Sequence, residues 1–150
     1  MRILIQECLS GQVEIDHQVV SKISNGEVIF VGFTFGDNEE IIDKMIEKLL
    51  KLRIFEDENG KTNQSLSVHG GSILCVSQFT LYADLSQGNR PSFTYALPGQ
   101  YSRPLYDYFC MKLSERMPDT QYGVFGADMK VSLINDGPFT ILLDSREVIK

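Results

Sequence analysis

Two short polar segments of the 150-residue chain carry the side chains most suited to hydrolytic chemistry. Ser77-Gln78-Phe79-Thr80 supplies two hydroxyls and an amide, and Asn135-Asp136-Gly137-Pro138 has the composition of a turn. A hydroxyl nucleophile needs a base beside it. The chain has two histidines, His17 and His69, and both lie in turn-like segments where solvated side chains are common. We therefore do not expect a hydroxyl–histidine pair.

The sequence shows no spacing typical of a metal centre or a phosphate-binding loop. Cys8, Cys75 and Cys110 are far apart and form no CxxC pair, and no HxH or HxxxH pattern occurs. The glycines after His69 are too few for a phosphate loop. We expect neither a metal nor a cofactor, and we expect the three cysteines to be reduced thiols, as in the cytoplasm.

Composition limits the kinds of partner. A net charge of −6 argues against a broad basic surface of the kind that binds DNA or an RNA duplex. No apolar run approaches the roughly 20 residues of a membrane span, and Gln6 and Glu7 interrupt the first apolar run before a signal-peptide core can form. We expect one soluble cytoplasmic domain over residues 1–150, with no membrane or DNA partner and with RNA contacts confined to a chain end.

The first half of the chain alternates strand and helix signals. Residues 1–16 and 28–36 are rich in β-branched and aromatic residues and predict a strand meander. Apolar residues recur at helical spacing over 39–52, after the capping residues Asp37 and Asn38. Residues 72–81 predict a strand buried on both faces, which places Ser77 to Thr80 at the C-terminal end of a central strand.

The second half contains a long irregular segment, residues 82–100, which we interpret as a functional loop. Pro104 is expected to start a second helix, residues 120–144 are strand-like, and residues 145–150 look like a frayed tail. Two helices among about seven strands predict a layered α/β fold. So few helices leave part of the sheet uncovered, so a second β layer or a dimer partner must cover it.

Several segments together resemble one enzyme family along nearly the whole chain, although each polar segment taken alone fits ordinary hydrogen bonding. The segments are RIFEDENGK, GGSILCVSQFTLYAD, GNRPSF, LYDYF and FGADMKVSLINDGPFT. They resemble the D-aminoacyl-tRNA deacylases, historically called D-tyrosyl-tRNA deacylases.

The resemblance implies a homodimeric layered α/β/β fold with two main helices, similar to the editing domain of archaeal threonyl-tRNA synthetases. It implies hydrolysis of the ester between a D-amino acid and the 3′ end of tRNA, with Gly-tRNA(Ala) also cleaved and L-aminoacyl-tRNA rejected. The implied partner is the aminoacyl-tRNA 3′ end.

The resemblance also implies roles for individual residues. The implied catalytic segment consists of Ser77, Gln78, Phe79 and Thr80, with N–H groups near Phe79 and Thr80 holding the oxyanion while the adenosine 2′-hydroxyl assists water. Thr80 is a less favoured nucleophile, because no base is near it in the sequence.

The remaining implied roles concern recognition of the substrate. A cis bond joins Gly137 and Pro138, which reach into the partner's site and reject L side chains. Phe125 and Met129 line the adenosine pocket, with a core role as the alternative, and Arg90 contacts tRNA phosphates.

Two positions depart from the family pattern. Phe139 stands where valine is usual, and Glu7 stands where an arginine is frequent. A related branch removes L-alanine from mischarged tRNA, but it has Pro-Gln-Ala-Thr where this chain has Ser-Gln-Phe-Thr. Two alternatives to D-aminoacyl-tRNA hydrolysis stay open. The protein could be a related deacylase that acts on mischarged L-alanyl-tRNA, or a non-catalytic dimer that binds the tRNA 3′ end.

Overall fold

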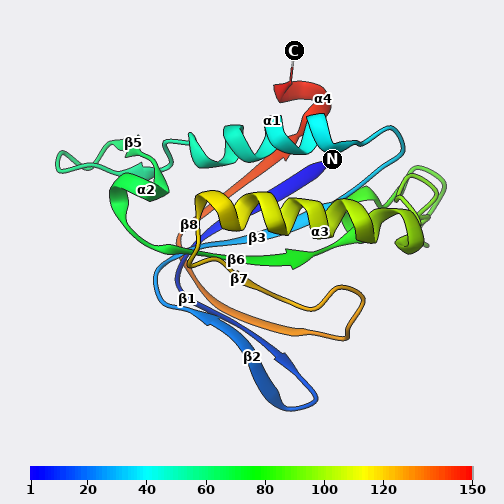
Figure 1. Ribbon diagram of the computed structural model, residues 1–150, viewed down its shortest axis with the longest axis horizontal. Helices are drawn as coiled ribbons and strands as arrows, with labels where there is room; N and C mark the ends of the chain where they lie inside the picture. Colours follow the sequence, from blue (N-terminus) through cyan, green and yellow to red (C-terminus); the bar gives the residue numbers. More distant parts are fainter. Residues whose placement is uncertain (150) are drawn as a thin grey trace.

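A strongly bent six-stranded sheet forms the centre of the protein in the computed structural model, which describes residues 1–149 (Figure 1). The strand order is β2-β1-β3-β6-β7, and β8 pairs with β1. The strands of this sheet are β1 (Arg2–Ile15), β2 (Gln18–Ile23), β3 (Gly26–Gly32), β6 (Ser72–Ser77), β7 (Gln121–Tyr122) and β8 (Lys130–Asp144). A separate hairpin consists of β4 (Phe55–Glu56) and β5 (Thr62–Gln64), joined through a turn that contains Asn59 and Gly60.

Two long helices cover one face of the sheet, as predicted, and two short ones complete the fold. The helices are α1 (Glu39–Leu50), α2 (Leu66–His69), α3 (Gly99–Arg116) and α4 (Ser145–Val148). Asn38 caps α1, because its side-chain Oδ1 accepts a hydrogen bond from the N–H of Ile41 at 3.1 Å. Within residues 1–149, no helix has the length and apolar character needed to cross a membrane.

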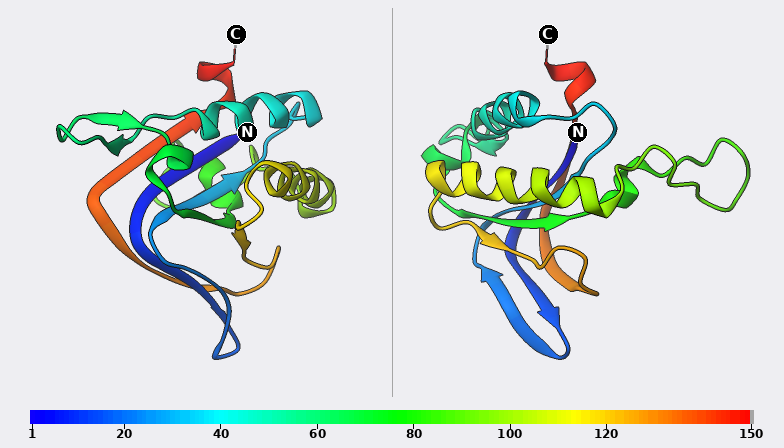
Figure 2. Two further views of the ribbon diagram at one scale, coloured as in Figure 1. Left: turned by 60° about the vertical axis from the view of Figure 1, so that its left-hand side comes forward. Right: turned by 45° about the vertical axis from the view of Figure 1, so that its right-hand side comes forward.

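Side chains of the central strands alternate between two cores. In β6, Ile73 and Cys75 pack into the core beneath α1 and α3, whereas Leu74 and Val76 pack into a second core on the other face. Val13 and Ile23, from the far end of β1 and from β2, close this second core. Figure 2 shows β1 and β8 curving back to form this second β layer. The predicted mixed α/β architecture is confirmed, and the second layer belongs to the same continuous sheet.

The predicted start of the second helix is wrong. The helix α3 begins at Gly99, and Pro104 lies inside it. A proline costs one intrahelical hydrogen bond there, so it does not have to mark the helix start. Tyr106, Phe109 and Leu113 are the large buried side chains of α3 and anchor it on the sheet.

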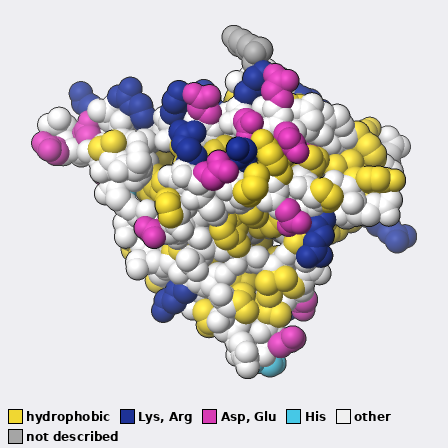
Figure 3. Space-filling view, in the orientation of Figure 1, with side chains coloured by type: hydrophobic (Ala, Val, Ile, Leu, Met, Phe, Trp, Pro, Cys, Tyr) yellow, Lys and Arg dark blue, Asp and Glu magenta, His cyan; other side chains and the backbone are white. Residues whose placement is uncertain are grey.

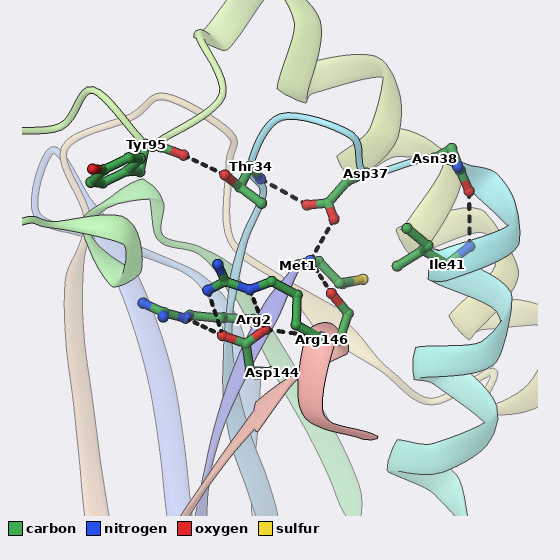
Figure 4. Close-up of polar contacts among 10 residues, drawn as sticks. Met1, Arg2, Thr34, Asp37, Asn38, Ile41, Tyr95, Asp144 and Arg146 are labelled. Atoms are coloured by element: carbon green, nitrogen blue, oxygen red, sulfur yellow. Dashed lines mark hydrogen bonds and ion pairs between the residues drawn. The ribbon is translucent and has the colours of Figure 1, made fainter. Parts of the chain in front are cut away.

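The C-terminal segment is not the frayed tail that the sequence predicts. Residues Ser145–Val148 form α4, and the buried Asp144 carboxylate accepts hydrogen bonds from Arg2 at 2.8 Å and Arg146 at 2.9 Å (Figure 4). The amino group of Met1 contacts Ser145 Oγ at 2.6 Å. Contacts with the first strand therefore hold this segment, and Lys150 lies outside the described residues.

Candidate active site

A pocket of about 710 Å³ opens at the C-terminal ends of the parallel strands β3 and β6. Its walls are formed by residues 31–33 and 76–79, by residues 96–99 and Ser102 at the start of α3, and by residues 125–129 before β8. Phe93 closes one side. The strand ends and the start of α3 thus converge on one concave site, which is where α/β sheets commonly bind ligands.

The turn that follows β6 presents free backbone donors beside this pocket. The N–H of Gln78 donates to Val31 O at 2.7 Å, and a 3₁₀ turn then runs over Phe79–Tyr82. Among residues 1–149, the N–H groups of Phe79 and Thr80 have no backbone acceptor, as is usual where a helical turn begins. Two adjacent free N–H groups are suited to hold a developing oxyanion.

The packing of this turn against β3 requires a glycine. A Cβ atom on Gly32 would lie 2.7 Å from the backbone oxygen of Gln78, which is too close for any side chain. Gly32 therefore allows the end of β3 to approach the turn that carries the free N–H groups.

The Thr80 hydroxyl has no base beside it. Its Oγ1 accepts a hydrogen bond from the Gln78 side-chain amide at 2.5 Å, and Thr80 is not part of the pocket wall. His17 is fully exposed in the β1–β2 turn, and the His69 ring stacks on Phe55 at 4.5 Å between centroids. Neither histidine lies in the pocket wall. Ser77, Gln78 and Phe79 do line the pocket.

Aromatic contacts attach the predicted functional loop to the site. Phe79 is 55% exposed and packs edge-to-face on Phe93, with the ring centroids 5.0 Å apart. The rest of the loop contains only short pairings such as Asp84 with Ser92, and it projects beyond the sheet (Figure 2). Arg90 lies exposed in this projection and does not line the pocket.

Both residues predicted for the adenosine pocket line the cavity. Phe125 and Met129 form its wall beside β8, and the Phe125 ring lies 5.5 Å from that of Tyr106. The guanidinium carbon of Arg103 lies 5.8 Å from the Phe125 ring centroid. Sequence reasoning missed Ser102 and Arg103, because it placed the helix start at Pro104. Pro98, which stands at the N-terminal cap of α3, could have indicated the true start, because proline is frequent at the beginning of helices.

The Gly137–Pro138 segment lies outside the pocket of its own chain. It forms an exposed bulge of β8, between the pairs Gln6–Thr140 and Cys8–Asn135, and its peptide bond is cis. Val131 of β8 lines the pocket. Gly137 is six residues later in the same strand, which corresponds to about 20 Å along β8. The structure therefore brings residues 77–79 together with Phe125 and Met129, but it does not bring Gly137 or Pro138 to them within one chain.

The two departures from the family pattern lie beside this bulge. Phe139 turns inward and packs against the main core. Glu7 is on β1, where it lies opposite the β8 bulge on one side and opposite Glu27 of β3 on the other. Its Oε1 is buried without a hydrogen-bond partner among the described residues. Burial and then the neighbouring Asp136 and Glu56 raise the pKa of Glu7 to about 7. Burial and then Glu7 raise the pKa of Glu27 to about 8.

Comparison with known proteins gives the family. The sequence model of the D-Tyr-tRNA(Tyr) deacylase family matches residues 4–144. The chain belongs to this family. A deacylase of this family from Listeria innocua, named D-aminoacyl-tRNA deacylase, is 49% identical over 150 residues, which cover all of both chains. The protein of the same name from Kosmotoga olearia is 49% identical over 147 residues, covering 98% of this chain and 99% of that one.

Two solved structures are similar to this deacylase-family fold. One is described as a c-Myc DNA unwinding element binding protein and has a TM-score of 0.91 at 35% identity, covering 96% of this chain and 98% of that one. The other is described as a probable eukaryotic D-amino acid tRNA deacylase. It has a TM-score of 0.83 at 18% identity, covers 95% of this chain and 97% of that one, and supports the fold alone.

Within residues 1–149, no group of three or more histidine, cysteine or acidic side chains is arranged to hold a metal ion. All three cysteines are free thiols. The pocket wall offers backbone donors, hydroxyls, amides, aromatic rings and one carboxylate, that of Asp128, which forms an ion pair with Lys130.

Proposed function

We propose that the protein hydrolyses the ester bond of D-aminoacyl-tRNA and releases the D-amino acid and the tRNA. The observation that carries the proposal is the pair of free N–H groups at Phe79 and Thr80, beside a 710 Å³ pocket in a chain of the deacylase family. Residues 1–150 act as a single deacylase domain in the cytoplasm.

Water is the nucleophile in this proposal, because no base is available to activate Thr80. The 2′-hydroxyl of the terminal adenosine assists the attack, and the N–H groups of Phe79 and Thr80 stabilise the negative charge on the carbonyl oxygen. One such donor contributes about 3–4 kcal/mol to transition-state stabilisation in other hydrolases. Ser77 and Gln78, which line the pocket next to this turn, orient the ribose and the acyl group.

The terminal adenosine occupies the part of the pocket formed by Phe125 and Met129. A base can stack on the Phe125 ring or pack against the Met129 thioether, and such stacking is worth about 1–3 kcal/mol per base. Arg103, beside Phe125, places a positive charge near the nucleotide. Arg90 contacts a phosphate from the projecting loop.

Chiral selection requires a second copy of the chain. Gly137 and Pro138 are exposed about 20 Å along β8 from their own pocket, so we infer that they enter the pocket of a partner in a homodimer. The exposed apolar side chains of Leu9, Ile134 and Leu142 lie on β1 and β8 around them and supply an apolar contact surface.

Rejection of L side chains by the Gly137–Pro138 backbone explains the expected substrate range. The rigid Gly137–Pro138 backbone collides with an L side chain, whereas a D side chain points elsewhere and glycine has none. The protein therefore cleaves many D-aminoacyl esters and also Gly-tRNA(Ala). The fold of the archaeal threonyl-tRNA synthetase editing domain is the expected structural relative.

The direct test is release of D-tyrosine from D-tyrosyl-tRNA by the purified protein, with uncharged tRNA binding measured in parallel. Catalytic release supports the proposal. Binding of tRNA without release would instead favour the non-catalytic dimer. Hydrolysis of L-alanyl-tRNA in preference to D-tyrosyl-tRNA would favour the related L-alanine branch.

A further inference from the structure

A second concave site lies at the opposite end of the helical layer from the active-site pocket. It has a volume of about 400 Å³ and lies between the C-terminal ends of α1 and α3 and the segment that enters α2. Its polar wall consists of Lys51, Arg53, Arg116, Ser65 and Ser67. Three cations and two hydroxyls thus face one hollow.

Glu47 balances part of this positive charge, because it pairs with Lys51 and the nearby charge of Arg116 also lowers its pKa. Arg53 donates from Nε to the backbone oxygen of Asn63 at 2.8 Å. Arg53 and Asp57 are linked through the Asn63 side chain: Arg53 Nη2 donates to its Oδ1, and its Nδ2 donates to Asp57 at 3.0 Å. Figure 3 shows Lys and Arg side chains over this end of the molecule with Asp and Glu side chains among them, but no acidic side chain of the described residues lines the hollow itself. The chain as a whole carries a net charge of −6. The hollow is therefore a local positive site on an acidic protein.

Helix ends explain part of this arrangement. Lys51 follows the last turn of α1, Arg116 ends α3, and cations are favoured near helix C-termini. Arg53 lies beyond both helices, and its contact with the Asn63 backbone fixes its guanidinium at the hollow. A guanidinium beside hydroxyl donors is the usual recognition set for a phosphate group. The hollow has no aromatic ring on which a base could stack, so the chemistry suits a phosphate and not a nucleobase.

The helix α3 sets the spacing between the two sites. Gly99 at its start lines the active-site pocket, and Arg116 at its end lines the basic hollow, so about 26 Å of helix separates them. Nucleotides in a stacked strand follow one another at about 3.4 Å. A strand whose terminal nucleotide occupies the active-site pocket thus reaches the hollow after about eight nucleotides.

We propose that this basic hollow binds a backbone phosphate in the acceptor stem of the tRNA whose 3′ end occupies the active-site pocket. The inference rests on the proposed function, because it takes the aminoacyl-tRNA as the substrate. It adds a stem contact that a substrate consisting of the aminoacylated adenosine alone cannot make.

The experiment compares a Lys51→Gln/Arg116→Gln variant with a Lys44→Gln/Lys112→Gln control. Each variant removes one cation in or directly after α1 and one in α3, but Lys44 and Lys112 pair with Glu40 and Glu115 on their own helices, outside the hollow. KM and kcat are measured for D-tyrosyl-tRNA and for D-tyrosyl-adenosine over a series of salt concentrations. Binding of uncharged tRNA is measured by fluorescence anisotropy, and thermal unfolding checks the fold.

For the hollow variant we expect KM for D-tyrosyl-tRNA to rise about tenfold at low salt, and the salt dependence of log KM to lose about one unit of slope per phosphate contact. D-tyrosyl-adenosine hydrolysis and the control variant should stay at the wild-type level. Equal losses in the control, or an unchanged affinity of the hollow variant for tRNA, would overturn the proposal. If wild-type protein cleaves neither substrate, the proposed function fails, and the anisotropy data still decide whether the hollow binds tRNA.

Discussion

At the scale of single residues, Thr80 is the side chain that most resembles a nucleophile, yet its hydroxyl is engaged by the Gln78 amide and has no base. We expect Thr80→Ala to lower kcat on D-tyrosyl-tRNA by no more than about fivefold, the effect of one lost neutral hydrogen bond. Loss of a true nucleophile costs on the order of 10⁴-fold or more. Steady-state deacylation kinetics measure the difference. Thr80→Ser serves as the control, and a collapse of activity in Thr80→Ala that Thr80→Ser rescues would identify threonine as the nucleophile.

Glu27 gives the protein a pH-dependent stability. Its pKa is raised by burial and by Glu7 to about 8 in the folded protein, from 4.5 as a free side chain. Between these values the folded protein holds a proton that the unfolded chain has released, so stability falls as pH rises through this window. Glu7, with a pKa of about 7, acts in the same direction.

We expect Glu27→Gln to raise the free energy of unfolding at pH 9 by about 2 kcal/mol and to change it little at pH 4.5. Urea unfolding across pH 4.5 to 9 measures the effect, with the exposed turn residue Glu58→Gln as the control. A stability curve for Glu27→Gln that stays parallel to that of the wild type would show that the Glu27 carboxyl does not change its protonation on folding.

Among the secondary-structure elements, the close contact between β3 and the 3₁₀ turn fixes the position of the free N–H groups of Phe79 and Thr80, the proposed oxyanion donors. A Cβ on Gly32 would lie 2.7 Å from Gln78 O, so Gly32→Ala must push this turn away from β3. A displacement of about 1 Å at a catalytic group can cost about 100-fold in rate. We expect kcat on D-tyrosyl-tRNA to fall by about 10- to 100-fold.

The control for this prediction is Gly11→Ala, whose Cβ would meet the Val28 side chain in the second core. That variant should lose stability but keep kcat, because its clash is with a side chain away from the pocket. Thermal unfolding and single-turnover deacylation separate the two effects. Wild-type kcat in folded Gly32→Ala would show that the position of the turn does not matter for catalysis.

The elements that could be predicted from the sequence are those whose determinants are local. The helix α1 follows from the Asn38 cap and from the spacing of Ile42, Met45 and Leu49. The burial of β6 on both faces follows from its continuous apolar run. The start of α3 could not be placed, because Pro104 is a strong local signal and the packing of Tyr106 that overrides it is a tertiary contact.

The helix α4 and the proximity of the Glu7 and Glu27 carboxyl groups could not be predicted for a related reason. Asp144 accepts a hydrogen bond from Arg2, which lies 142 residues earlier in the chain. The local sequence around residues 145–149 therefore does not indicate an ordered helix. Glu7 and Glu27 meet only through the register of β1 and β3. Of the candidate site, the Ser77–Thr80 segment, Phe125 and Met129 were identified through motifs. The free N–H groups and Ser102 required the fold.

In the whole molecule, the proposed chiral selection depends on a second copy of the chain. The outer surface of β8 exposes Ile134 and Leu142 on either side of the Gly137–Pro138 bulge. We expect Ile134→Lys/Leu142→Lys to convert a dimer to a monomer in light scattering after size-exclusion chromatography, and to raise the rate of L-tyrosyl-tRNA hydrolysis relative to D-tyrosyl-tRNA by about tenfold or more. The reason is that a monomer lacks the partner's Gly137 and Pro138.

Val68→Lys/Met111→Lys is the matched control, because these exposed apolar residues lie on α2 and α3. It should keep the wild-type mass and the wild-type ratio of the two rates. A wild-type protein that is monomeric at assay concentration and still discriminates between D and L esters would contradict the cross-subunit role of the bulge.

The most direct test of the whole account is a side-by-side measurement of deacylation rates on D-tyrosyl-tRNA, L-tyrosyl-tRNA and glycyl-tRNA with the same protein preparation. We expect the D-tyrosyl and glycyl esters to be hydrolysed and the L-tyrosyl ester to be spared, because the proposed rejection depends on a collision that only an L side chain makes. Equal hydrolysis of the L ester, or no hydrolysis of any of the three, would contradict this expectation.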